Sequence, residues 1–565
     1  MAGLDYSSWS KQELISEINK LSERAKLGLV WEDRGEKNAE ELSGKITLFE
    51  EIKSKSLHPN KNEKFNFLIE GDNFQSLTCL NYTHAEKIDV IYIDPPYNTG
   101  NNDFKYNDSF VLAEDSFRHS SWLSFMSKRL WLAKDLLKRS GIIIISIDDN
   151  EQAHLKLLCD EVFGENNFVA CIPTVMNLKG NQDQYGFAGT HEYTLIYAKD
   201  KAMAEFHNLY LDQDDVESEW EEDSIGWWKK GAGLKMTGIN APRAKQPSLF
   251  FPVWVKPDGS QISIEEQSKW NKILPITDGN EMSWRWSKEK FKRDADDIII
   301  LGTAPNWTFY KKQRPELGDM PSKKPKSIFY KPEYSTTNGT NQVKAIFGEK
   351  VFDYPKPIDL IIDLLSITTS KDSLILDFFA GSGTTGHAVA VLNKSDEGQR
   401  RFILCTNNEE QIAEKITYQR IKMISKEIST IAKISGLPIN LKYFKCKLAP
   451  RSKSDSNKKL IAKQINTILQ FREDCFEEIT IKPEFSIYKN ETNVLGILLE
   501  EESVNLFLNE IKKTKIIIGK IYAFSYGDDD FSDYFEELGT SIKVVPIPIS
   551  LLNAYRQAYA KGGIK

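Results

Sequence analysis

"VIYIDPPYNTGNND", Val90 to Asp103, runs an apolar strand-like segment directly into an aspartate, two prolines and a tyrosine. Prolines cannot donate a hydrogen bond to a sheet ladder, so the pair must end the strand at Asp94 and fix the backbone just beyond it. In isolation, such a tetrapeptide is best interpreted as a strand-ending turn. Its meaning depends on what the rest of the chain places beside it.

Strand-like and helix-like segments alternate on both sides of this stretch. Apolar runs begin at Phe65, Lys87 and Gly141, and helical patterns separate them, including a long one over residues 121–141. The alternation resumes at Val351 and continues to the strand-like "RRFILCTN", residues 400–407. Buried strands separated by helices indicate a parallel α/β sheet.

This pattern divides the 565 residues into five segments. We expect a peripheral N-terminal arm of one charged helix and a loop (1–50), a first half of the core (51–204), an inserted domain of short strands and long loops (205–345), a second half of the core (346–450), and a small C-terminal α/β domain (451–565). A polar linker is expected at residues 451–459.

Composition indicates a soluble intracellular protein. Apolar content of 40% and charged content of 27% are ordinary for globular chains. No apolar run is long enough to cross a bilayer and no signal peptide is evident, so we expect a cytoplasmic location. The cysteines form no CxxC pair and have no histidine at ligand spacing, which predicts free thiols and no metal site: Cys79, Cys159, Cys171, Cys405, Cys446 and Cys475.

The expected insert is locally basic although the net charge is −7. Residues 226–345 hold 21 Lys+Arg against 12 Asp+Glu, and seven of the twelve tryptophans. We interpret most of these tryptophans as a small aromatic core. Candidate phosphate contacts are Lys229, Lys230, Lys235, Arg243, Lys245, Arg285, Lys311, Lys312, Arg314, Lys323, Lys324 and Lys326.

"LILDFFAGSGTTG", Leu374 to Gly386, places G-x-G-x-x-G after a strand and at the start of a helix. Glycines let the backbone approach a ligand closely, and a helix N-terminus favours negative charge. Glu409, after the next strand, is placed to bind ribose hydroxyls. The motif alone fits a dinucleotide and S-adenosylmethionine equally well.

The opening motif favours the second ligand. An aspartate at the carboxyl edge of a parallel sheet lies where ligands bind. The Asp94 carboxylate, the Pro95 carbonyl and the Tyr97 ring match an exocyclic amine on a planar base, with two N–H donors and one face to stack. Such acceptors would direct the amine's lone pair at a sulfonium methyl group on the neighbouring glycine loop.

These residues resemble the amino-methylating DNA methyltransferases. The resemblance rests on "DPPYNTG", "DFFAGSGTTG", "FDYPKPIDL", "GDN" at residues 71–73, "GIIIISIDDNE" and "HEYTLIYAK", and covers about 29–445. The catalytic motif precedes the cofactor motif, as in the beta group, and the chain is most similar to the modification subunits of type III restriction systems. The resemblance implies a Rossmann-like, permuted S-adenosylmethionine-dependent sheet with an inserted target-recognition domain.

The resemblance also implies roles for individual residues. Asp94, Pro95 and Tyr97 would hold a flipped-out adenine for methylation at N6, and Pro96 would shape the loop. The expected cofactor residues also include Asp377 and Glu409. Those given a place on the cofactor are Lys356 over the methionine portion, Asp72 at the cofactor adenine, and, around the methionine and ribose, Phe379, Ala380, Gly381, Ser382, Gly383 and Thr384.

Several alternatives remain open. The target could be cytosine N4, RNA or a protein amide, and the chain could be a DNA-binding subunit with an inactive pocket. A nicotinamide oxidoreductase would leave Asp94 to Tyr97 and the basic insert unexplained. The expected partner is double-stranded DNA. The resemblance further suggests a homodimer, and any cleavage would come from a separate restriction subunit, because the chain carries no ATP-binding G-x-x-x-x-G-K-[ST] motif.

Overall fold

The computed structural model describes residues 9–26, 29–42, 44–59, 64–101, 103–107, 109–180, 185–210, 220–314, 322–426, 436–451, 454–513, 518–526, 531–538 and 542–561. The chain forms two compact units, one of residues 1–207 with 326–565 and the other of residues 208–325. The second unit is shorter than the insert expected at 205–345.

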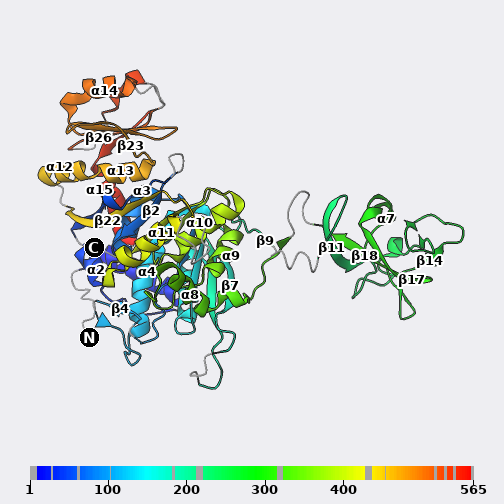
Figure 1. The fold of residues 1–565 in the computed structure, drawn as a ribbon. Coiled ribbons are helices and arrows are strands. Elements are labelled where there is room, and N and C mark those ends of the chain that lie inside the picture. Colours follow the sequence, from blue (N-terminus) through cyan, green and yellow to red (C-terminus); the bar gives the residue numbers. More distant parts are fainter. Residues whose placement is uncertain are drawn as a thin grey trace. The chain divides into compact units, whose positions relative to one another are not determined.

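The larger unit is built on a nine-stranded sheet with the order β1-β22-β2-β21-β20-β3-β6-β8-β7. Figure 1 labels β2, β22 and β7 of this sheet. Six neighbouring strands from β22 to β6 run parallel, and antiparallel strands flank them at both edges. The strands are β1 (Lys45–Glu51), β2 (Asn66–Glu70), β3 (Ile88–Ile93), β6 (Leu137–Ile147), β7 (Phe168–Val175), β8 (His191–Ala198), β20 (Leu374–Asp377), β21 (Arg401–Thr406) and β22 (Leu441–Pro450). The expected α/β fold is confirmed.

The strand order interleaves the two halves of the core. Strand β20, which leads into the glycine loop, pairs in parallel with β3, which leads into Asp94. Ile375 lies opposite Val90 and Leu376 opposite Ile91. Because parallel neighbours end at the same edge of a sheet, motifs almost 300 residues apart in sequence emerge side by side.

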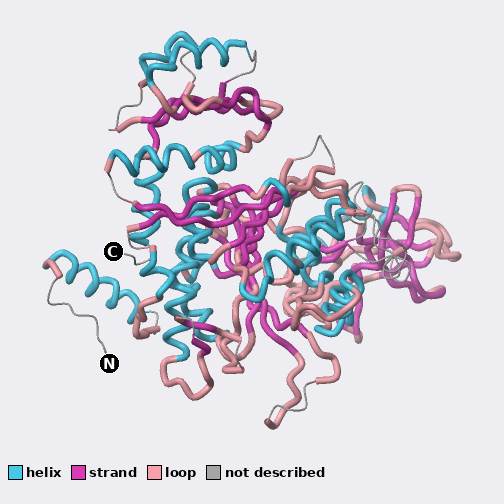
Figure 2. The backbone as a smooth tube through the Cα atoms, turned by 60° about the vertical axis from the view of Figure 1, so that its left-hand side comes forward, coloured by secondary structure: helices cyan, strands magenta, loops and turns pink. Residues whose placement is uncertain are grey.

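Two layers of helices enclose the sheet (Figure 2). In the first layer α4 contacts both α3 and α5, and in the second α10 contacts both α9 and α11. Their bounds are α3 (Asn73–His84), α4 (Arg118–Leu136), α5 (Gln152–Phe163), α9 (Ile358–Thr368), α10 (Thr384–Asp396) and α11 (Tyr418–Ser425). The shorter helices α2 (Lys37–Glu41) and α8 (Thr336–Phe347) and the hairpin β4–β5 (Lys105–Tyr106, Ser109–Phe110) also belong to this unit.

The structure corrects two expectations in the first half. The predicted helix α1 (Lys11–Lys26) is confirmed, but the expected N-terminal arm also contains β1, whose Ile46, Leu48 and Phe49 are buried in the core. Helix α4 ends at Leu136 instead of continuing to residue 141, and β6 begins at Leu137. The cause is pairing: Leu137 already lies opposite Ile88, with a register shift before the main ladder.

The C-terminal segment shares the core of the nine-stranded sheet instead of being merely appended to it. Helix α15 packs on α3, and Leu551 and Tyr555 belong to the same buried cluster as Leu77. Helix α12 begins at Asp455, inside the stretch expected to be a linker. The elements are β23 (Glu477–Ile481), β24 (Phe485–Lys489), β25 (Val494–Leu498), β26 (Ile518–Phe524) and β27 (Lys543–Ile547), with α12 (Asp455–Gln464), α13 (Asn466–Glu473), α14 (Val504–Lys513) and α15 (Ile549–Lys561).

The smaller unit is made of short strands around an aromatic core of Leu234, Phe251, Trp284, Phe291 and Phe309. Its main sheet has the order β10-β11-β18-β17, and a second has the order β13-β12-β14. The bounds are β9 (Leu209–Tyr210), β10 (Glu221–Asp223), β11 (Gly226–Gly233), β12 (Val253–Val255), β13 (Ile262–Ser263), β14 (Asn271–Ile273), β15 (Ile276–Thr277), β16 (Asn280–Glu281), α7 (Lys288–Arg293), β17 (Ile298–Thr303), β18 (Asn306–Gln313) and β19 (Ser322–Lys323).

Two general features complete the description. All six cysteines are free, as expected. Within the described ranges, every helix is too short or too polar to cross a membrane.

Candidate active site

The DPPY loop begins directly where β3 ends, at Ile93. The indole nitrogen of Trp122, on α4, donates a hydrogen bond to the Pro96 carbonyl over 2.7 Å. No hydrogen bond among the described residues involves the Pro95 carbonyl. The scaffold therefore uses one proline oxygen to hold the loop and leaves the other as an acceptor.

Asp94 lies in a compact group of charged and aromatic side chains. Lys356 Nζ lies 3.2 Å from Asp94 Oδ1 and 2.8 Å from Glu192 Oε2. The Tyr97 hydroxyl donates to Glu192 and accepts from Lys356, and the ammonium lies 4.7 Å from the centre of the Tyr97 ring. Although Asp94 Oδ1 forms this ion pair, it is buried without an aligned hydrogen-bond donor, so the carboxylate retains acceptor capacity.

Burial and neighbouring charges act in opposite directions on the pKa values of Asp94 and Lys356. Burial raises the pKa of Asp94, Lys356 acts to lower it, and Glu192 raises it further. Burial acts to lower the pKa of Lys356, but Asp94 and Glu192 outweigh burial, and the pKa is raised overall. Lys356 is therefore a charged ammonium between two carboxylates.

Two residues of this group add to what the sequence suggested. The ammonium of Lys356 is directed at Asp94, Glu192 and Tyr97, and its expected place over the methionine portion of the cofactor stays a prediction. Glu192 was not singled out at all. Its only sequence signal is its place at the start of the strand-like "HEYTLIYAK", and the contact with Lys356 joins positions 164 residues apart.

The glycine loop turns sharply between β20 and α10. Gly381 and Gly383 have φ values of +47° and +81°, a region that side chains with a Cβ rarely adopt. The Gly381 carbonyl accepts from the Thr417 hydroxyl, and the Ala380 amide donates to the Cys405 carbonyl. These bonds hold the loop open at the edge of the sheet.

Other candidate cofactor residues also support the loop. Asp377 accepts from the Phe379 amide (2.9 Å) and the Thr385 hydroxyl (2.5 Å), and burial raises the pKa of its carboxyl to about 7. Ser382 and Thr384 accept from Arg420, which is fully buried; burial lowers the pKa of Arg420 to about 10. Sequence reasoning missed Arg420, since a lone arginine on a helix carries no motif.

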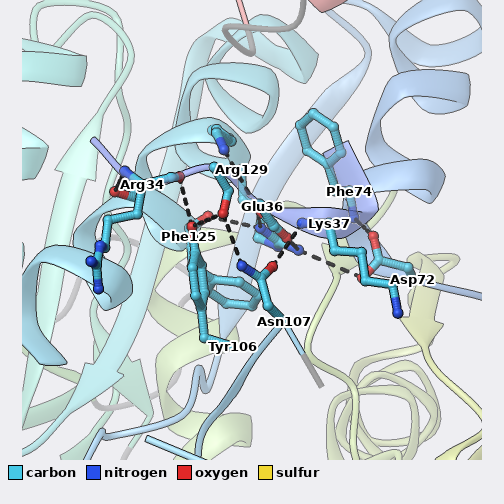
Figure 3. A network of polar contacts seen from close by, with 12 residues as sticks. Arg34, Glu36, Lys37, Asp72, Phe74, Tyr106, Asn107, Phe125 and Arg129 are labelled. Carbon is cyan, nitrogen blue, oxygen red and sulfur yellow. Dashed lines mark hydrogen bonds and ion pairs between the residues drawn. The ribbon is translucent and has the colours of Figure 1, made fainter. Parts of the chain in front are cut away.

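Asp72 caps helix α3, accepting from the amides of Phe74 and Gln75. Its other oxygen lies 3.6 Å from Arg129, a fully buried residue of α4. Arg129 makes a two-pronged pair with Glu36 at 2.7 and 3.1 Å (Figure 3). The N-terminal segment thus reaches the expected cofactor-adenine end of the site, which the sequence did not indicate.

Glu409 follows β21 and lies at the same sheet edge as Asp72 and the glycine loop. Its carboxylate is half-exposed and pairs with Lys105 Nζ at 2.9 Å. The position is compatible with the predicted ribose contact. The ligand roles of Asp72, Glu409 and residues 379–384 stay predictions.

This arrangement suits an S-adenosylmethionine-dependent transfer. Two parallel strands deliver an acceptor-lined loop and a glycine loop at a helix N-terminus to one edge. A Cβ at Gly381 would lie 3.2 Å from the Phe352 ring, and one at Gly383 would lie 3.1 Å from the Thr417 methyl group. Together with the positive φ values, these contacts disfavour a side chain at either position.

Comparisons with known proteins agree with this geometry. A family model described as a DNA methylase, N6_N4_Mtase, matches residues 88–419, more than half of the chain. The type III restriction-modification enzyme EcoPI Mod subunit of Escherichia phage P1 is 41% identical over 78% of this chain and 71% of its own length. The type II methyltransferase M.KpnI of Klebsiella pneumoniae is 35% identical over 76% of this chain and 98% of its own.

Among solved structures, the M1.HpyAVI–SAM complex aligns with 63% of this chain and with 98% of its own chain. The sequence identity is 15% and the TM-score is 0.29. The sequence comparisons confirm the expected resemblance to type III modification subunits. The chain therefore belongs to the N6_N4_Mtase family of DNA methylases and is an S-adenosylmethionine-dependent DNA methyltransferase of the restriction-modification kind.

Proposed function

We propose that the chain methylates the N6 amine of an adenine flipped out of duplex DNA, at a specific sequence. The observation that carries this proposal is the parallel pairing of β3 and β20, since it sets the Asp94 loop beside the glycine loop. S-adenosylmethionine, when bound, supplies an electrophilic methyl group there.

In this proposal Asp94 and the Pro95 carbonyl accept the two N–H groups of the amine, and Tyr97 stacks on the base. The two acceptors direct the nitrogen lone pair away from the ring and toward the methyl carbon. With the cofactor bound, a nitrogen–carbon bond would form as the carbon–sulfur bond breaks, and the amine would then lose one proton. Asp94 is positioned to accept that proton.

Glu192 and Lys356 act as positioning residues. The ammonium of Lys356 partly neutralises Asp94, and Glu192 holds that ammonium and the Tyr97 hydroxyl. Because Glu192 shares the ammonium, Lys356 cannot collapse entirely onto Asp94 and occupy its acceptor lone pairs.

The smaller unit is proposed to read the DNA. Three of the candidate basic residues are already paired with carboxylates: Lys312 with Asp223, Arg314 with Asp223 and Asp297, and Arg243 with Glu281. We assign these a structural role. Lys230 and Lys245 are exposed and are better phosphate candidates.

The DNA-reading proposal is tested by salt dependence. Lys230→Ala should weaken binding of all duplex sequences alike. It should also reduce the slope of log K against log salt concentration by about 1, the amount expected for the loss of one phosphate contact. Lys312→Ala serves as the matched control and should leave that slope unchanged. An unchanged slope for Lys230→Ala removes this residue from the interface.

The methylated nucleoside identifies the target base. Duplex DNA from cells expressing the chain is digested to nucleosides and analysed by mass spectrometry, and N6-methyladenine is the expected product. N4-methylcytosine, which a family of this scope also allows, would instead assign the alternative target. Parallel assays with labelled S-adenosylmethionine on RNA and protein should show no transfer.

We propose that the chain works in the cytoplasm of a bacterium or with a phage genome and forms a homodimer. The type III relatives are named as Mod subunits of restriction-modification enzymes, which supports the proposal that this chain can pair with a restriction subunit. Light scattering measures the dimer. Co-purification with a co-expressed restriction subunit tests the second partner.

A further inference from the structure

A second group of chemically versatile side chains lies behind the catalytic loop. His119 is in the first turn of α4, Glu151 precedes α5, and His154 is in the first turn of α5. One ligand atom from each of the three lies within 4.8 Å of the others. None of these residues has a part in the methyl-transfer site described above.

The two histidines differ in how they meet Glu151. His119 Nδ1 is hydrogen-bonded to Glu151 Oε1 over 2.7 Å, whereas His154 Nδ1 lies 3.0 Å from Glu151 Oε2. The second pair lacks hydrogen-bond alignment, and both its atoms are buried without an aligned partner. Two ligands of one zinc ion are roughly 3–3.5 Å apart, given metal–ligand distances of about 2.0–2.2 Å.

Burial adds a second, independent observation. The Glu151 side chain is completely buried, whereas the side chains of His119 and His154 are 38% and 36% exposed. A buried carboxylate with an unsatisfied oxygen requires a compensating partner. The two partly exposed rings separate this buried oxygen from solvent by one layer of side chains.

We propose that His119, Glu151 and His154 bind one divalent transition-metal ion, with Zn²⁺ as the representative, through the two Nδ1 atoms and the carboxylate, and with solvent completing the coordination. Imidazole and carboxylate suit Zn²⁺ and its neighbours, whereas Mg²⁺ prefers oxygen ligands alone. The site is separate from S-adenosylmethionine binding.

Two contacts must change on binding. Coordination through His119 Nδ1 replaces the hydrogen bond of this nitrogen to Glu151 Oε1. Arg118 Nε donates to His119 Nε2 over 3.2 Å, which requires the proton of the neutral ring to be on Nδ1. Coordination through Nδ1 moves that proton to Nε2 by way of solvent, so Arg118 must release the ring. No net charge is gained or lost by the imidazole.

The ion would stabilise the catalytic loop from behind. Asn98, which follows Tyr97, is buried, has a φ of +59°, and donates to Glu151 Oε1 over 2.5 Å. An ion that fixes Glu151 also fixes this hydrogen bond. The role is positional, because the group touches neither the expected base nor the glycine loop.

The test uses the full-length protein, stripped with EDTA and desalted, and titrated with Co²⁺ and then Zn²⁺. Wild type should bind about one ion in a saturable manner, with visible Co²⁺ bands and without the near-ultraviolet absorption of thiolate ligands. Zn²⁺ but not Mg²⁺ should raise the thermal midpoint.

Single substitutions test which histidines bind the ion. His119→Ala and His154→Ala should each weaken Zn²⁺ binding at least about 100-fold and abolish the thermal shift. His207→Ala, which removes an exposed histidine elsewhere, should behave as wild type. Both cluster histidines are partly exposed, so the variants should fold, as circular dichroism will verify; if one fails, the other decides. The proposal is overturned by an absence of saturable binding in wild type, by thiolate absorption, or by wild-type affinity in His154→Ala.

Discussion

Replacing Glu192 by glutamine tests the charged group around Asp94 most finely. The change keeps the shape of the side chain and removes one of the two carboxylates that flank Lys356, at 2.8 Å. The remaining anion is Asp94, at 3.2 Å, so the ammonium should move toward it and compete with the substrate amine.

The size of the effect follows from the bonds lost. A hydrogen bond to a charged group contributes about 1.5–3 kcal/mol. Because each 1.36 kcal/mol corresponds to a tenfold change in rate, kcat/KM should fall about 10- to 150-fold. Binding of S-adenosylmethionine should change little, since Glu192 contacts the DPPY loop and not the glycine loop.

The pH profile of kcat/KM tests the direction in which each neighbour shifts the pKa of Asp94. In the proposed mechanism Asp94 must be ionised to accept the amine, so activity should be lost as pH falls through its pKa. Glu192 raises that pKa and Lys356 lowers it. Glu192→Gln should therefore move the acid limb of kcat/KM to lower pH, and Lys356→Met should move it to higher pH.

The assay is methyl transfer from labelled S-adenosylmethionine to duplex DNA between pH 5 and 9, at one ionic strength. His191→Ala is the matched control, since this exposed neighbour on β8 should leave rate and profile unchanged. Acid limbs that shift in the same direction in both charge variants, or that do not shift, would refute the reasoning.

Three further predictions concern the supports of the site. Trp122→Phe leaves the Pro96 carbonyl without its donor and should cost about 1–3 kcal/mol in transition-state stabilisation, seen as reduced kcat/KM at unchanged cofactor affinity; equal losses in both would contradict the role. Glu36→Gln removes the main counterion of buried Arg129 and should destabilise the fold by about 3–5 kcal/mol in urea denaturation, and a change below about 1 kcal/mol would argue against it. Gly381→Val places a branched side chain at φ +47° and should abolish cofactor binding in calorimetry, whereas full retention would tell against the loop.

Much of the fold could be predicted because it depends on patterns within short stretches of sequence. The apolar strands before Asp94 and Gly381, and the helices between them, follow from periodicity and proline or glycine punctuation. Strand β1 was missed because its short apolar run lies next to a charged helix, and only pairing with β22 reveals it. Helix α4 was predicted too long because Leu137 enters the sheet through a register shift that no local signal marks.

The candidate site divides in the same way. Asp94 to Tyr97 and the glycine loop could be found from motifs, since their chemistry depends on neighbours in sequence. Glu192, Arg129 and Arg420 could not, because each acts through a contact with a distant segment. Pairs of opposite charge far apart in sequence carry no signal until the strand order brings them together.

The separation of base and cofactor roles is tested most directly by Asp94→Ala. The account predicts that methyl transfer to duplex DNA falls below detection while the calorimetric Kd for S-adenosylmethionine stays within about threefold of wild type, since the proposal assigns the Asp94 carboxylate to the base and the glycine loop to the cofactor. A loss of cofactor affinity as large as the loss of activity would contradict it.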